Sequence, residues 1–146
     1  MPQEISATIS GSGEILVGGD GVGRMRCLAH AALTALTPYK MFWNEFGPVS
    51  AAIADDTTTY RIIIPEAAVA SGVIFEGVVS GPIDDVVTPS LAIAVGNALS
   101  ITNGVITDDG ADYTGVSNQF AVCKTTSASA ATTQDIWLIP REITGT

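Results

Sequence analysis

The chain contains one histidine, His30, and this limits the catalytic chemistry that the sequence can support. A Ser-His-Asp or Cys-His catalytic unit needs a histidine that accepts a proton, but His30 lies within the apolar residues 28–32 with no Ser or Asp beside it. We expect it to be buried or half-buried. Cys27 and His30 have the spacing of half a zinc site, yet Cys123 is the one cysteine left to complete it. The sequence therefore predicts no catalytic residue, metal or cofactor.

Two other motifs resemble ligand loops. Gly19, Gly21 and Gly23 recur at alternate positions, but neither the Gly-x-Gly-x-x-Gly spacing nor a Gly-Lys-Ser/Thr ending is present, so this segment predicts a turn. Asp108 and Asp109, followed by Asp112, could supply oxygen ligands to calcium. Their spacing is not that of an EF-hand, and an acidic loop is favoured, with a weak calcium site left open.

The composition indicates a protein that covers apolar surface with other protein. Of the 146 residues, 47% are hydrophobic and 14% charged, and the mean hydropathy is +0.38. No apolar run reaches the roughly 18–20 residues of a membrane-spanning helix, so insertion into a membrane is not expected. We expect the apolar surface to be covered by oligomerisation or by docking onto a protein scaffold. The net charge of -9 opposes nucleic-acid binding. The N-terminal residues lack the features of a signal peptide.

Short segments bounded by glycine and proline predict an all-β fold, a compact antiparallel sandwich or barrel-like domain with short strands. The strongest hairpin signal is Asn103-Gly104, which favours a type I′ turn. Gly81-Pro82 and Gly47-Pro48 are expected to end the strands that precede them. The predicted strands are residues 14–17, 39–46, 58–64, 72–80, 91–95, 98–102, 105–107, 119–125 and 135–140, with loops at residues 108–112 and 126–133.

Three parts of the chain leave alternatives open. Residues 24–36 suit a strand or a helix, and a strand is favoured. Cys27 and Cys123 are expected to be buried thiols, although a disulfide between them is possible. Residues 1–13 are assigned to an N-terminal arm and residues 14–146 to a single β domain. Ile5 and Ile9 in the arm would pack on a neighbour's sheet edge, unless the arm is a disordered tail.

Aromatic residues cluster in one predicted strand. Tyr39 and Trp43 face one side of it, and Phe42 and Phe46 face the other. The cluster therefore serves either the core alone, or the core together with a contact surface for a partner.

The second half of the chain resembles the β-rich decoration, or cement, proteins of tailed-phage capsids. The likeness spans residues 60–139 and rests on four segments: residues 60–66 (Tyr-Arg-Ile-Ile-Ile-Pro-Glu), 77–82 (Gly-Val-Val-Ser-Gly-Pro), 95–99 (Val-Gly-Asn-Ala-Leu) and 103–107 (Asn-Gly-Val-Ile-Thr).

This resemblance implies a non-enzymatic virion protein that decorates and stabilises the outer capsid surface by bridging subunits of the major capsid protein. It also implies self-association, as a homotrimer, and a location in the host cytoplasm during assembly. Two alternatives are kept. One is a β-sandwich module that binds glycans or a host surface through Trp43 or Tyr113. The other is another virion component, such as a tail or baseplate part.

Overall fold

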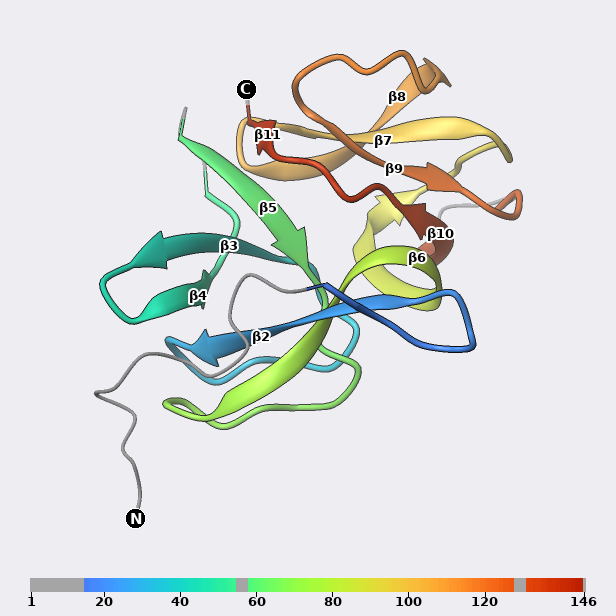
Figure 1. The fold of residues 1–146 in the computed structure, drawn as a ribbon. Helices are drawn as coiled ribbons and strands as arrows, with labels where there is room; N and C mark the ends of the chain where they lie inside the picture. The colour runs from blue at the N-terminus through green and yellow to red at the C-terminus, as the bar shows by residue number, and fades with distance from the viewer. Residues whose placement is uncertain (1–14, 55–57, 128–130, 146) are drawn as a thin grey trace.

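The computed structural model describes residues 15–54, 58–127 and 131–145, and eleven β-strands in these ranges form one mixed sheet (Figure 1). The all-β prediction is confirmed, and the sheet is sandwich-like and does not close into a barrel. The strands are β1 Leu16–Val17, β2 Gly23–Ala29, β3 Tyr39–Asn44, β4 Gly47–Ala51, β5 Thr59–Ile63, β6 Ile74–Leu91, β7 Asn97–Thr102, β8 Val105–Asp112, β9 Gln119–Cys123, β10 Ala131–Leu138 and β11 Ile143–Thr144.

One strand, β6, joins two halves of the sheet. The strand order is β11-β5-β3-β4-β2-β6-β10-β9-β7-β8, with β1 added beside β2. Residues 74–80 of β6 pair with β2, and residues 81–91 pair with β10. Figure 1 shows β6 curving from the lower part of the molecule, beside β2, up to β10. We call the part of the sheet on the β2 side of β6 the N-terminal half and the part on the β10 side the C-terminal half.

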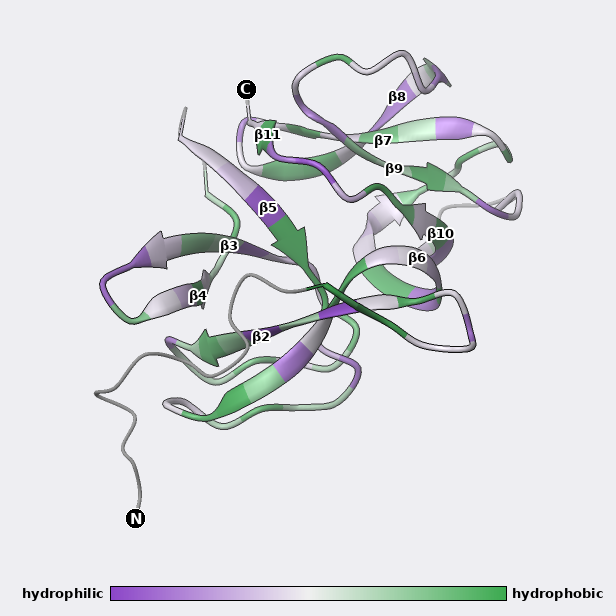
Figure 2. Cartoon of the chain, in the orientation of Figure 1, coloured by the Kyte–Doolittle hydropathy of each residue, from purple (hydrophilic) through white to green (hydrophobic). Residues whose placement is uncertain are grey.

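Strand β5 and Ile64, which follows it, lie between two hydrophobic clusters, and this explains the apolar run at residues 62–64. Tyr60, Ile62 and Ile64 point into a large cluster that is shared with the C-terminal half, while Ile63 points into a smaller one. A strand that is buried on both faces reads as a continuous apolar run instead of an alternating one. Figure 2 shows the arrowhead end of β5 and much of β9 as hydrophobic, in contrast to the hydrophilic end of β8. The smaller cluster also contains Met25, Cys27, Met41 and Val79.

The bend in β6 depends on Gly81. Its φ is +93°, and a Cβ added there would overlap the backbone carbonyl oxygen of Gly21. Pro82 follows within the same strand, opposite Trp137 of β10. Asp85 also has a positive φ, +58°, so the backbone of β6 departs twice from regular extended geometry. The prediction that Gly81-Pro82 ends a strand is wrong, because the pair bends the strand and does not terminate it.

Other local predictions have mixed outcomes. The Asn103-Gly104 hairpin is confirmed, with φ of +50° and +73° at its two turn residues. The strand at residues 39–46 ends before Gly47-Pro48 as predicted, but these two residues begin β4, which the sequence reading missed along with β11. Residues 108–112 extend β8 and do not form a separate loop, and residues 92–95 lie outside any strand. The sheet is not wholly antiparallel either, because β2 and β4 are parallel.

The ambiguous residues 24–36 are a strand in their first part. Strand β2 covers Gly23–Ala29, and its side chains alternate between buried and half-buried positions. After β2 the chain forms a loop in which Leu33 makes an isolated antiparallel bridge to Val69. No helix long and apolar enough to cross a bilayer occurs in the described ranges. Residues 1–14, which include Ile5 and Ile9, lie outside the described residues, as do residues 128–130 of the predicted loop at residues 126–133. The loop prediction is wrong for residues 131–133, because β10 begins at Ala131.

Replacing Gly81 with alanine should destabilise the fold more than the same change at Gly72. Both glycines have a positive φ, but a Cβ at Gly72 would meet nothing within 4 Å. Gly72→Ala should therefore lower the free energy of unfolding by about 1 kcal/mol, the cost of the backbone conformation. Gly81→Ala adds an overlap with backbone and should cost about 1–3 kcal/mol more. Urea denaturation of both variants measures the difference, and equal losses would contradict this role for Gly81.

Candidate functional site

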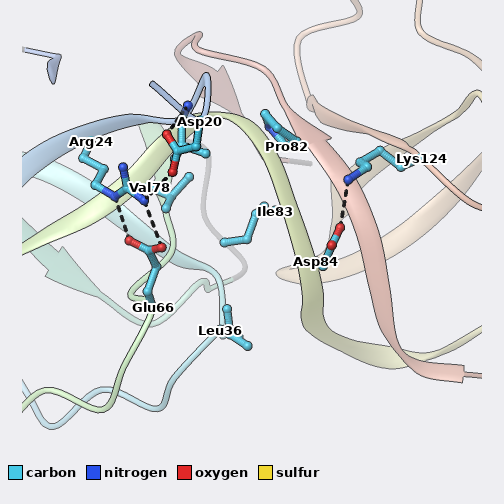
Figure 3. Close-up of a pocket in the computed structure, with 10 residues that line it drawn as sticks. Asp20, Arg24, Leu36, Glu66, Val78, Pro82, Ile83, Asp84 and Lys124 are labelled. Atoms are coloured by element: carbon cyan, nitrogen blue, oxygen red, sulfur yellow. Dashed lines mark hydrogen bonds and ion pairs between the residues drawn. The ribbon is translucent and has the colours of Figure 1, made fainter. Parts of the chain in front are cut away.

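A hollow of about 440 Å³ lies where the two halves of the sheet meet at β6 (Figure 3). Its floor is apolar and includes the buried side chains of Val22, Val78 and Ile83. Five charged side chains surround this floor. They come from the turn before β2 (Asp20), from β2 (Arg24), from the segment after β5 (Glu66), from β6 (Asp84) and from the segment after β9 (Lys124). The remaining lining residues are Leu36 and Pro82.

On the β2 side, Arg24 is held by two carboxylates. Its Nε and Nη2 donate to the two oxygens of Glu66, at 2.7 and 3.1 Å, and Nη2 also donates to Oδ2 of Asp20 at 3.2 Å. Glu66 first and Asp20 second raise the pKa of Arg24 further above its ordinary value. This forked geometry fixes the orientation of the guanidinium as well as its charge.

Asp20 is placed by the turn that the glycine pattern predicted. Its Oδ1 accepts a hydrogen bond from the backbone N–H of Val22 at 3.0 Å, and Gly21 has a φ of +77°. Together with the side chain of Arg24, this N–H lowers the pKa of Asp20. The predicted turn is confirmed, and its aspartate belongs to the hollow.

On the opposite side of the hollow, Lys124 donates from Nζ to Oδ1 of Asp84 at 2.8 Å. The same ammonium lies 5.4 Å from the centre of the Trp137 ring, so an aromatic face also stabilises it. The hollow thus presents three carboxylates and two cations above an apolar floor. Such a surface suits a bound group that has both an apolar and a charged part.

The predicted aromatic interface lies elsewhere, on β3 and the turn after it. Trp43 is 54% exposed, whereas Tyr39, Phe42 and Phe46 are half-buried. Tyr39 packs against the smaller hydrophobic cluster and accepts a hydrogen bond from the Thr34 N–H at 2.8 Å. It also borders an apolar groove of about 380 Å³. The two interpretations of this segment, core alone or core together with a contact surface, both stay predictions. The strand supplies core contacts through Tyr39 and an exposed side chain through Trp43.

The prediction for His30 is wrong. His30 is exposed, because β2 ends at Ala29 and the chain turns away from the core. Cys27, by contrast, is fully buried, and burial raises the pKa of its thiol to about 12. Cys27 and Cys123 are free thiols in separate hydrophobic clusters, so they do not form the possible disulfide. Burial also raises the pKa of Cys123.

The acidic residues of β8 are used for internal hydrogen bonds. Oδ1 of Asp108 accepts from the N–H of Gly110 at 2.8 Å, and Oδ2 of Asp109 accepts from Nε2 of Gln119 at 2.6 Å. Asp112 is exposed at the end of the strand. In the part of the chain that the structure describes, no group of three or more His, Cys, Asp or Glu side chains is arranged to hold a metal ion.

Sequence reasoning missed the hollow. Arg24 and Glu66 are 42 positions apart, and Lys124 and Asp84 are 40 apart, so no local spacing links either pair. The glycine-rich turn that holds Asp20 was the one part of the hollow that the sequence indicated, because Arg24 follows the regular alternation of β2 and gives no separate signal.

Comparison with known proteins gives a likeness in structure and none in sequence. No family model matches the chain, and no curated protein matches it in sequence. Among solved structures, the chain is similar to the N base of the head fibre protein gp8.5 of bacteriophage phi29, with a TM-score of 0.52 and 12% identity. The match covers 84% of this chain and 98% of that one. At this identity the likeness shows the fold: the chain has the β architecture of that base domain.

Asparagine in place of Asp20 should remove a pH-dependent part of the stability. A carboxyl group whose pKa is lowered by folding stabilises the fold above its ordinary pKa of 3.8, and this contribution disappears as the pH falls through the lowered value. Asp20→Asn should therefore lower the melting temperature at about pH 7 and have little effect near about pH 2. Thermal melts over this pH range, with Asp112→Asn as a control at another exposed aspartate, test this. A loss that is equal at both pH values would contradict it.

Proposed function

We propose that this chain is a non-enzymatic structural component of a phage particle, and that it forms the base of a projection on the head surface. The observation that carries the proposal is the fold likeness, because the alignment covers almost the whole of a head fibre base domain. The sequence resemblance to capsid decoration proteins supports the same location on the particle.

In this role the base contacts subunits of the major capsid protein and bridges neighbouring ones, and it self-associates as a homotrimer. The surface of the chain supports attachment to protein. Trp43 is exposed at 54%, and several valine and isoleucine side chains are exposed on the strands and loops, including Val17 and Val116. Exposed aromatic and aliphatic groups supply contact area for burial against a partner.

The chemistry of the described residues fits a binding role. Each charged side chain of the hollow has an ion-pair partner within it, and the exposed His30 lies beyond the end of β2. Attachment by a base requires a rigid domain with exposed contact area, and β6 joins the two halves of this sheet by backbone hydrogen bonds.

Retention on phage heads tests the proposal directly. Purified chain is mixed with heads of its phage that lack it, and the heads are then sedimented and imaged by cryo-electron microscopy. The chain should co-sediment and appear at symmetry-related positions on the outer head surface. A chain that never associates with heads would overturn the proposal.

The same assay tests the aromatic segment as an attachment surface. Trp43→Ala should weaken retention by about tenfold or more, as expected for an exposed tryptophan that becomes buried in an interface. Val95→Ala, which also shortens an exposed apolar side chain, serves as the control. Equal retention of the two variants would show that β3 faces away from the head.

A further inference from the structure

The carboxylates of the hollow are open to a further cation. The side chains of Asp84, Asp20 and Glu66 are 63%, 52% and 48% exposed, and Oδ2 of Asp84 makes no hydrogen bond to any described residue. The hollow holds one more carboxylate than it holds cations, in a chain whose net charge is -9. Its local charge and the charge of the whole chain therefore favour a positively charged group.

The floor of the hollow adds a second requirement. Val78 and Ile83 are buried beneath it, and Leu36 and Pro82 complete an apolar surface between the two groups of ion pairs (Figure 3). A ligand must therefore cover apolar area and place its charge at the rim. Arginine and lysine side chains have this form, because an aliphatic stem carries the charged head.

We propose that the hollow receives an arginine or lysine side chain from a different protein. This inference rests on the proposed function for the identity of the partner, which is then a protein of the phage head. The aliphatic stem lies on the floor formed by Val78 and Ile83, and the cationic head is placed between Asp84 and the Asp20–Arg24–Glu66 group.

A second copy of the chain is a poor source of this side chain, because each of its own cations either contacts another group or is partly buried. Arg24, Lys124 and Arg26 each form an ion pair, the last at 3.8 Å with Glu76. Arg141 hydrogen-bonds to Tyr113, the ammonium of Lys40 lies over the Tyr60 ring, and Nη1 of Arg61 is buried. A second copy would also bring a net charge of -9 of its own. Charge complementarity thus points to a basic partner.

Titration of the isotope-labelled full chain with N-acetyl-arginine amide, followed by amide chemical shifts, tests the site without any head protein. N-acetyl-lysine amide is the second probe, and N-acetyl-citrulline amide is the uncharged control. Both cationic probes should shift the amides of residues 20–24 and 83–84, while citrulline should not. Shifts elsewhere on the chain, or equal shifts with citrulline, would overturn the proposal.

Two variants with opposite expected effects on the affinity for the arginine probe distinguish a change at the site from a general loss of folded protein. Asp84→Asn should weaken binding of the arginine probe by about fivefold, the effect of losing one exposed carboxylate, and Lys124→Met should strengthen it by a similar factor. Asp112→Asn, which changes the net charge of the chain as Asp84→Asn does, should bind like the unmodified chain. Unchanged binding in Asp84→Asn would contradict the site.

Sedimentation of the chain alone examines the second-copy alternative. A salt-sensitive dimer that is abolished by Arg26→Gln and by Asp84→Asn would place this chain's own arginine in the hollow and overturn the inference.

A positive titration without retention on heads would refute the proposed function and keep the site. Normal retention with a negative titration would refute the site and keep the function.

Discussion

The structure depends on the bend in β6, the 18-residue strand that pairs with β2 along its first part and with β10 along its second. The chain can turn there because Gly81 adopts a positive φ and leaves room for the carbonyl oxygen of Gly21. Without a Cβ at this position, the turn before β2 lies directly against the strand. One continuous strand can then serve both halves of the sheet, and the large hydrophobic cluster fills the space between them.

The hollow follows from the same bend. Where β6 leaves β2 and joins β10, its side chains cannot cover both neighbours, and Val78 and Ile83 are left under an open depression. Charged residues from segments far apart in the sequence surround it, and each cation is paired across at least 40 positions. These ion pairs are partly exposed and contribute modestly to stability. Their main effect is to hold carboxylates in fixed positions around an apolar floor, which is the basis of the proposed recognition of a basic side chain.

Part of this architecture could be predicted from the sequence. Asn103-Gly104 permitted few conformations, and the β-branched residues 62–64 have a strong preference for a strand, so local chemistry identified both elements. The effect of Gly81-Pro82 could not be predicted locally, because the same dipeptide ends a strand or bends it depending on which strands lie on either side. The hollow could not be predicted for a related reason. Arg24 and Glu66 are 42 positions apart, and only the order of the strands in the sheet brings them together. His30 was misjudged because its neighbours are apolar, although β2 stops one residue before it.

We expect β6 to make the two halves of the sheet one cooperative unit, because both halves pair with it. Native-state hydrogen exchange in increasing denaturant tests this most directly, because it reports the opening free energy of each backbone amide. If β6 couples the halves, the most protected amides of β2 and β5 and those of β9 and β10 should share one opening free energy, equal to that of global unfolding. Two separate values, with one half opening while the other stays protected, would contradict the account.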